Sequence, residues 1–238
     1  MPRRFAISWN TVALELVIVF VGLFAALQAD EWRDRRELER AQTEYLERLA
    51  DDLSESLRSG RRLARRQAER RDAVRHVHES LQAGRILDDD TLLFEEGLLR
   101  VYHLPGPTLL RATYDEMVAS GMYTRLRSRE LKQAISSLYG NEADLQRLFV
   151  WWREGASPAV NTLDARVEFY NEPGSSDPGE EPAERARFDF QRLARDTQLR
   201  NQFFWAADTH DDWVRELRSL VEQIEEADSL VALALADR

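Results

Sequence analysis

The chain has 238 residues, with 43 acidic and 33 basic side chains and a net charge of -10, so its overall charge does not favour binding to nucleic acid. It is 43% hydrophobic and 32% charged, which excludes a protein made mostly of membrane spans and argues against wholesale disorder. Because it contains no cysteine, it can form no disulfide, thiolate metal site or cysteine nucleophile.

The first predicted element is a membrane-spanning helix between two tryptophans, Trp9 and Trp32. The segment reads WNTVALELVIVFVGLFAALQADEW, in which Glu15 is the only charged residue before Asp30. Along a helix the two indole rings would lie about 34 Å apart, which suits a hydrocarbon layer of roughly 30 Å with an aromatic anchor at each interface. We therefore predict an N-terminal leader and transmembrane helix over residues 1–30 and a helical extramembrane domain over residues 31–238.

One face of this predicted span is small or polar. Glu15, Gly22 and Ala26 lie within about 40° of one another on a helical wheel, and the bulkier side chains gather opposite them. Small residues let two membrane helices approach closely, and a carboxyl group in hydrocarbon needs a partner, water or a proton. We expect this stripe to pack against a second copy of the chain. The alternative is a span that begins later and leaves Glu15 among lipid headgroups, because the uninterrupted apolar run from Leu16 to Leu27 falls short of the about 20 residues that a span needs.

The arginines on either side of the span give conflicting signals about its orientation. Arg3 and Arg4 precede the span, whereas a larger group between Arg33 and Arg40 follows it, interleaved with acidic residues. The arginine count alone favours a cytoplasmic C-terminal domain. We expect the opposite, a cytoplasmic N-terminus and a periplasmic C-terminal domain, because the leader is short. No small-residue cleavage pattern follows Leu27, so we expect a retained anchor rather than a cleaved signal peptide.

The chain beyond the span has the pattern of a long amphipathic helix. Apolar residues recur at a spacing of three to four from Leu38 to Leu57, without proline or glycine before Gly60. This periodicity predicts that the membrane helix continues directly into a long helix in water. We expect Gly84 to end the helix that follows.

Short local signals mark the remaining helices. Thr113 and Ser128 are predicted N-caps, and Gly121 is placed to end a helix in the left-handed conformation. A later helix is expected to continue to Tyr170, and the acidic Pro/Gly/Ser stretch at 171–183 is predicted to be a mobile loop. No segment shows strand-like alternation, so we predict an all-α fold in which a helical bundle follows the long helix.

Three blocks of the sequence carry a resemblance to a known family. They are ELVIVFVGLFAALQADEWRDRRELERAQTEYLERLADDL from Glu15, TYDEMVASGMYTRLRSRELKQAISSLY from Thr113 and FQRLARDTQLRNQFF from Phe190. Together they resemble a family of uncharacterised bacterial membrane proteins that have one N-terminal span and a helical extramembrane domain. The resemblance implies a bacterial inner-membrane protein with Glu15 and Trp32 as motif positions. Relatives usually carry uncharged amides where this chain has Ala29-Asp30-Glu31, and the family brings no activity with it.

The sequence offers no catalytic or cofactor motif, so we expect no enzyme activity, no cofactor and no bound metal. His103 and His210, the latter followed by Asp211 and Asp212, are the candidate catalytic groups. They lack a nucleophile elbow, a phosphate-binding loop and a metal-ligand pair at helical spacing. Catalysis would require one of these histidines to lie in a cleft with a carboxylate at hydrogen-bond distance.

These observations favour an interaction or scaffold protein held at a membrane. Its expected partners are the lipid bilayer, a second copy bound through the transmembrane helix to form a homo-oligomer, and an unknown protein, but no nucleic acid. The alternative is a ligand sensor, in which a molecule bound near Tyr114, Tyr123, Trp151 and Trp152 alters the long helix and hence the span. Aromatic residues at helical spacing belong to a core more often than to a pocket, so the scaffold is preferred.

Overall fold

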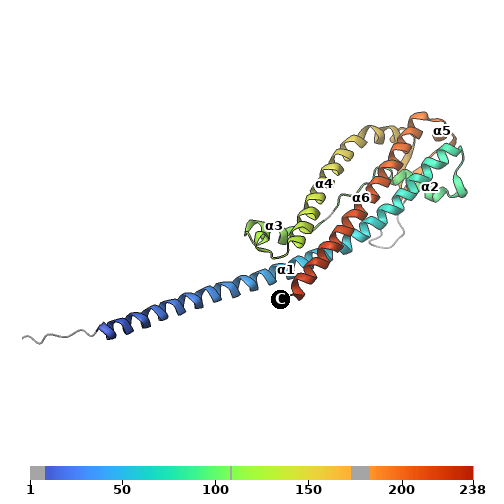
Figure 1. Ribbon diagram of the computed structural model, residues 1–238. Coiled ribbons are helices and arrows are strands. Elements are labelled where there is room, and N and C mark those ends of the chain that lie inside the picture. Colours follow the sequence, from blue (N-terminus) through green and yellow to red (C-terminus); the bar gives the residue numbers. More distant parts are fainter. Residues whose placement is uncertain (1–8, 108, 173–182, 238) are drawn as a thin grey trace, which may run out of the picture. The chain divides into compact units, whose positions relative to one another are not determined.

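The computed structural model shows a predominantly helical chain, which confirms the all-α class (Figure 1). The chain forms two compact units, Met1–Arg48 and Leu49–Arg238. Among the helices that the structure describes, none has a stretch long and apolar enough to cross a membrane. The described residues are 9–107, 109–172 and 183–237, and the side chains of 9–19, 25–27, 153 and 155–160 lie outside this description.

Helix α1 (Trp9–Ala83) is 75 residues long and contributes to both units. It contains no proline, and it ends where Gly84 adopts a φ of 70°, a left-handed conformation that glycine adopts without a steric penalty. The predicted continuation of the N-terminal segment into a long helix and the predicted helix end at Gly84 are therefore confirmed, and the same helix also runs unbroken through Gly60. In the first unit, the described side chains of residues 20–24 and 28–37 are all exposed.

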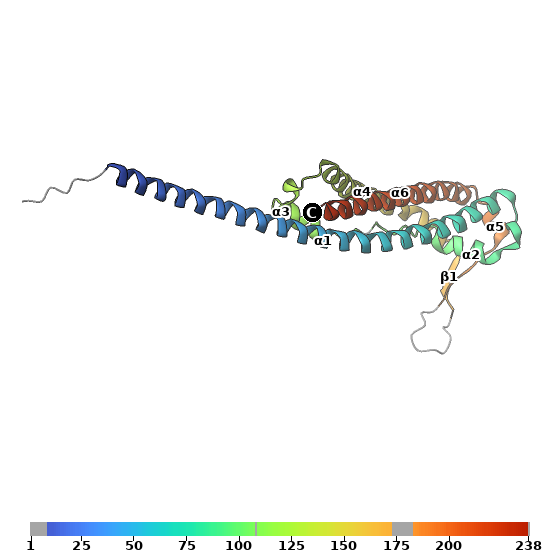
Figure 2. The same cartoon turned by 60° about the horizontal axis from the view of Figure 1, so that its bottom comes forward.

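The second unit is organised around three long helices: the C-terminal part of α1, α4 (Arg129–Asp164) and α6 (Thr197–Ala236) (Figures 1 and 2). Helix α6 runs antiparallel to α4, since Gln223 bonds to Asn141 near one end and Gln198 bonds to Thr162 near the other. It also lies against α1, where Arg61 pairs with Glu225 at 2.7 Å. The predicted helical bundle is therefore confirmed.

Short elements connect these helices, and their caps follow local sequence signals. Asp90 and Ser128 each accept a hydrogen bond from the backbone N–H three residues further on, at the starts of α2 and α4, as N-cap residues do. The predicted cap at Thr113 is wrong, because α3 already begins at Ala112 and the Thr113 side chain is buried in its first turn. The short elements are η1 (Leu87–Asp89), α2 (Thr91–Arg100), α3 (Ala112–Ala119), η2 (Tyr123–Arg125) and α5 (Phe190–Arg195).

A small β-hairpin departs from the purely helical expectation. Helix α4 ends at Asp164 rather than continuing to Tyr170, and strands β1 (Glu168–Asn171) and β2 (Glu184–Arg187) pair in antiparallel register. Each strand has four residues and all of β1 is exposed, so neither shows the alternation by which strands are recognised. The predicted mobile loop at 171–183 falls mostly on residues 173–182, which lie outside the description.

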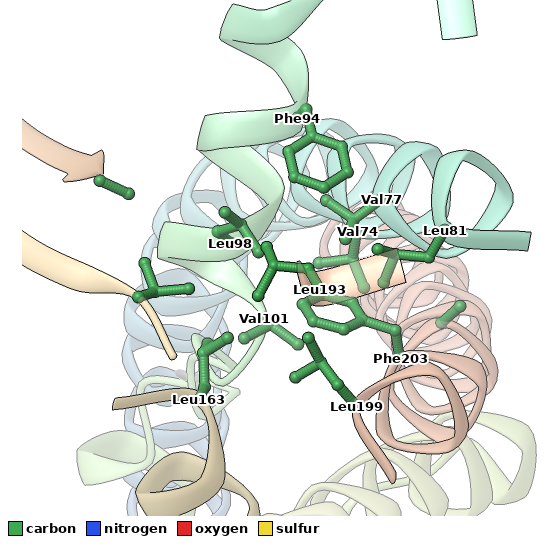
Figure 3. Packing of buried hydrophobic residues seen from close by; sticks show 13 residues of the cluster. Val74, Val77, Leu81, Phe94, Leu98, Val101, Leu163, Leu193, Leu199 and Phe203 are labelled. Atoms are coloured by element: carbon green, nitrogen blue, oxygen red, sulfur yellow. The ribbon is translucent and has the colours of Figure 1, made fainter. Parts of the chain in front are cut away.

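An apolar cluster lies where α1, α2, α5 and α6 meet the end of α4, and its labelled side chains point toward one another (Figure 3). Burying each large apolar side chain contributes about 1.5–3 kcal/mol, so this cluster fixes the end of the bundle that carries the hairpin. The labelled residues are Val74, Val77, Leu81, Phe94, Leu98, Val101, Leu163, Leu193, Leu199 and Phe203.

Candidate functional site

The residues predicted to act in the membrane are only partly described. Gly22 is exposed, and a Cβ atom built on it would meet nothing within 4 Å. Trp32 is 55% exposed, with the Arg36 guanidinium 3.9 Å from its ring centroid. The described part of the chain therefore places no partner against the predicted packing stripe at Gly22. The side chains of the other predicted positions, Trp9, Glu15 and Ala26, lie outside the described residues.

The aromatic residues named for a ligand fall into two separate groups. Tyr114 stacks on Tyr139 at 4.0 Å and meets Tyr123 edge-on at 5.9 Å. The Tyr139 hydroxyl donates to the Leu110 carbonyl at 3.0 Å, so this group holds α3 and the preceding segment against α4. Neither Tyr114 nor Tyr123 lines a described cavity with the tryptophans of α4.

Trp151 and Trp152 instead line a cleft of about 590 Å³ between α4, α6 and the residues that follow α2. From α6 come Gln202, Trp205 and Asp212, whose spacing of three and then seven places them on one face of a helix. Trp151 and Trp205 are 66% and 65% exposed. The cleft therefore has large indole surfaces facing solvent on two of its walls.

The floor of the cleft is fixed by Trp213, which is fully buried. Its indole N–H donates to the Pro105 carbonyl at 3.1 Å, and its ring meets that of Trp152 edge-on at 5.0 Å. Two residues further along the segment that follows α2, the Pro107 carbonyl accepts a hydrogen bond from the Gln146 amide at 2.6 Å. Side chains of α6 and α4 thus satisfy the backbone of the extended segment after α2, which removes much of its freedom to move.

His210 lies at the base of the cleft and is fully buried. Its Nε2–H donates to the Val101 carbonyl at 2.9 Å, and its Nδ1 accepts from the Gln67 amide at 2.9 Å. Burial lowers the pKa of the imidazole below its usual value, so the ring is neutral at pH 7. Both ring nitrogens are used to join α1, α6 and the end of α2, and neither contacts a carboxylate. The neighbouring Asp211 pairs instead with Arg75.

The ionic groups that line the cleft are acidic. Asp208 is exposed and has no ion-pair partner in the described part of the chain, and Asp212 pairs with Arg215. The described lining contains no arginine or lysine. Burial raises the pKa of Tyr102 well above its usual value, so this phenol remains uncharged. Among its described lining residues, the cleft therefore combines aromatic walls with carboxylates and has no cation.

His103, the other predicted candidate, lies in a different place. It is exposed and lines a hollow of about 360 Å³ beside the hairpin, together with Asp164 and Glu184. Partial burial of its ring lowers its pKa, and the nearby Arg70 and Arg100 lower it further. No group of three potential metal ligands occurs among the described residues.

Sequence analysis missed most of the cleft. Trp205 stands in the aromatic run from Phe203 to Trp205, and its spacing from Gln202 and Asp212 was the available signal. Phe203 is buried while Trp205 is exposed, a difference that a helical wheel anchored on the core positions could have indicated. The pairing of Gln67 with His210 leaves no local signal, because the two residues are 143 positions apart.

No protein-family model matches the chain, and comparisons with curated proteins and with solved structures find no match either. The resemblance to a bacterial membrane-protein family therefore stays a prediction, and any function must be argued from the residues themselves.

Proposed function

We propose that the chain is a single-pass, membrane-anchored helical protein that works by holding partners. Its N-terminal helix would lie in the bilayer and self-associate, and the Leu49–Arg238 unit would bind a protein partner in water. The single observation that carries this proposal is a bare apolar stretch of α1. Residues Phe20 to Phe24 are all exposed, and their large side chains are between 59% and 68% exposed.

Five consecutive residues of a helix point all the way around its axis, because each is turned about 100° from the last. Apolar side chains at such positions leave no polar face for water, and a helix that is apolar all round belongs in lipid or in a protein interior. The sequence extends this apolar character toward Trp9 and Trp32, which suit the two interfaces. We propose the bacterial inner membrane, with the N-terminus in the cytoplasm and the C-terminal unit in the periplasm.

Membrane fractionation tests the anchor directly. The full chain should stay with membranes through an alkaline carbonate wash and be released by detergent. Replacing Leu23 and Phe24 together by arginine should move it to the soluble fraction, because each charge at mid-membrane costs about 2.5–3.5 kcal/mol. Leu233→Arg is the matched control, because Leu233 is 60% exposed, like Leu23, but lies on α6. Recovery of the unaltered chain from the soluble fraction without detergent would overturn the anchor.

Self-association through the small stripe needs its own measurement. In a membrane two-hybrid assay, Glu15→Leu and Gly22→Leu should each lower the signal, because they remove a polar contact or fill the space that close helix approach requires. Phe20→Leu, on the opposite side of the wheel, should leave the signal unchanged. An equal signal from all three variants and the unaltered chain would rule out this interface.

The second candidate function is a membrane-tethered ligand sensor, and the aromatic cleft is the observation that favours it. In that case binding in the second unit would alter α1, which also contributes to the first unit. A thermal-shift screen against small metabolites finds such a ligand, because a ligand that binds the folded state raises its melting temperature. A sensor also requires that the ligand change the two-hybrid signal of the membrane helix, whereas a scaffold should give the same signal with and without it.

A further inference from the structure

We propose that the cleft between α4 and α6 binds a small organic cation with an aromatic body, of which an arylalkylamine is the simplest example. The site lies wholly within the Leu49–Arg238 unit and does not depend on the membrane anchor. Three features of the cleft support this ligand class: its exposed indoles, an aspartate without an ion-pair partner and a buried oxygen without a donor, both judged among the residues that the structure describes.

The walls supply the aromatic surface. Trp151 and Trp205 each leave about two thirds of their surface in solvent, although exposing an indole forgoes the large gain that its burial brings. Tryptophan is also the side chain whose ring face attracts an ammonium group most strongly. A ligand with a flat apolar ring and a positive charge would cover both walls and use both properties.

The charge of the lining selects the sign of the ligand. Asp208 has no cationic partner in the described structure, and the described lining holds Asp212 but no arginine or lysine. An anionic ligand would meet two carboxylates at this site, and a neutral one would leave Asp208 unbalanced. An ammonium group placed near Asp208 satisfies both the carboxylate and the indole faces.

A buried acceptor adds a hydrogen-bonding requirement. Gln202 lines the cleft, and its Oε1 is buried without a hydrogen-bond partner in the described part of the chain. An unpaired buried oxygen costs about 1–3 kcal/mol, so a ligand N–H that this amide turns to meet would remove a penalty already present in the free protein. An alkylammonium group carries three such donors.

The size and stiffness of the cleft suit a small molecule. Its volume of about 590 Å³ falls within the range of about 300–1,000 Å³ that is typical of small-molecule sites. Trp213 and His210 hold its base by hydrogen bonds to Pro105 and Val101. A floor fixed in this way is already formed before binding, which lowers the cost of ordering it.

Three small probes that share a phenyl ring and differ in charge test the proposal. At pH 7, phenethylamine is a cation, 2-phenylethanol is neutral and phenylacetate is an anion. Each is titrated calorimetrically into the full-length chain in detergent, and the heat of titration into detergent alone is subtracted. We expect phenethylamine to bind at least about fivefold more tightly than the alcohol and the anion not to bind.

Variants then place the binding in the cleft. Trp205→Ala should weaken phenethylamine binding by about tenfold and Asp208→Asn by about threefold to tenfold. Both residues are exposed, so these changes leave the core untouched, and unchanged melting temperatures confirm folding. Glu226→Gln and Leu233→Ala are the matched controls, because both side chains are exposed on the distant part of α6 and should leave the affinity unchanged.

Three results would overturn the proposal: no phenethylamine binding at millimolar concentration, equal binding of all three probes, or an affinity unaffected by Trp205→Ala. None of them bears on membrane anchoring, which fractionation measures separately.

Discussion

At the scale of single residues, the buried contacts of His210 should make the stability of the fold depend on pH. Burial is the main reason that the pKa of His210 in the folded state lies below the usual 6.5, and the nearby Arg70 lowers it further. The hydrogen bond to the Val101 carbonyl and the charge of Asp211 act in the opposite direction and raise the pKa. A proton on Nδ1 would remove the acceptor that Gln67 uses. The unfolded chain therefore takes up a proton near pH 6.5 that the folded chain resists, so stability present above that pH is lost as the pH falls.

Urea unfolding between pH 8 and pH 5 measures this effect. The free energy of unfolding should fall below pH 6.5 by up to about 1.4 kcal/mol per pH unit for this one proton. His210→Gln should be less stable at pH 8 but show a shallower pH dependence. His103→Gln should reduce the slope less, because the pKa of this ring is also lowered but the side chain is exposed, whereas His210 is fully buried. If the slope were the same with and without His210, its buried ring would not be the source.

At the scale of elements, α2 packs against α1 through a contact that only glycine permits. A Cβ atom on Gly97 would lie 2.3 Å from the Ala73 carbonyl oxygen and 2.5 Å from Val77 Cγ2. Because one of these neighbours is backbone, the two helices would have to move apart to admit a methyl group. Gly97→Ala should therefore lower the free energy of unfolding by about 1–3 kcal/mol, as measured by urea denaturation.

Gly140→Ala is the matched control for this contact. Gly140 is also inside a helix, but it is exposed and a Cβ there meets nothing within 4 Å. Alanine should stabilise the chain at that position by about 0.4–1 kcal/mol, because it restricts the unfolded backbone and favours helix. Equal effects of the two substitutions would show that helix propensity, not the α1 contact, decides the outcome.

Elements whose signals are local could be predicted, and those that depend on distant partners could not. Ser128 and Gly84 mark helix ends because a cap or a left-handed glycine acts within one turn. The tight fit at Gly97 depends on Ala73, which is distant in the sequence, and nothing around Gly97 records it. The hairpin was missed for a similar reason, since β1 gains its pairing from β2 across the acidic stretch rather than from its own pattern.

The same distinction governs the candidate site. Trp151 and Trp152 stand out in the sequence, where a core role was preferred for them, and in the structure they line a cleft. Their assignment to one group with Tyr114 and Tyr123 failed because helical spacing says which residues share a face, not which helices meet. Trp205 reaches the cleft only because α6 lies antiparallel to α4.

At the scale of the whole molecule, the first described side chains of α1 are exposed, and the helix acquires buried side chains before the end of the Met1–Arg48 unit. Every described side chain from 28 to 37 is exposed, as are those of 20–24. The buried part of α1 includes Leu46, Leu49 and Leu53, none more than 1% exposed. The stability of the fold should therefore depend on α1 from its first described buried side chain, Gln42, onward and not on the exposed residues that precede it.

A pair of truncations tests this dependence. A chain of residues 38–238 should unfold in urea with the same free energy as the full chain, because the removed residues 1–37 include no described buried side chain. The slope of this free energy against urea should also be the same, because the slope follows the surface that unfolding exposes. A chain of residues 54–238 lacks the three buried leucines, each of which costs about 2–5 kcal/mol when its side chain is cut back to alanine. That loss approaches the total stability of a typical domain, so the shorter chain should not fold. A loss of more than about 1 kcal/mol in the 38–238 chain would show that the exposed N-terminal helix takes part in the folded core.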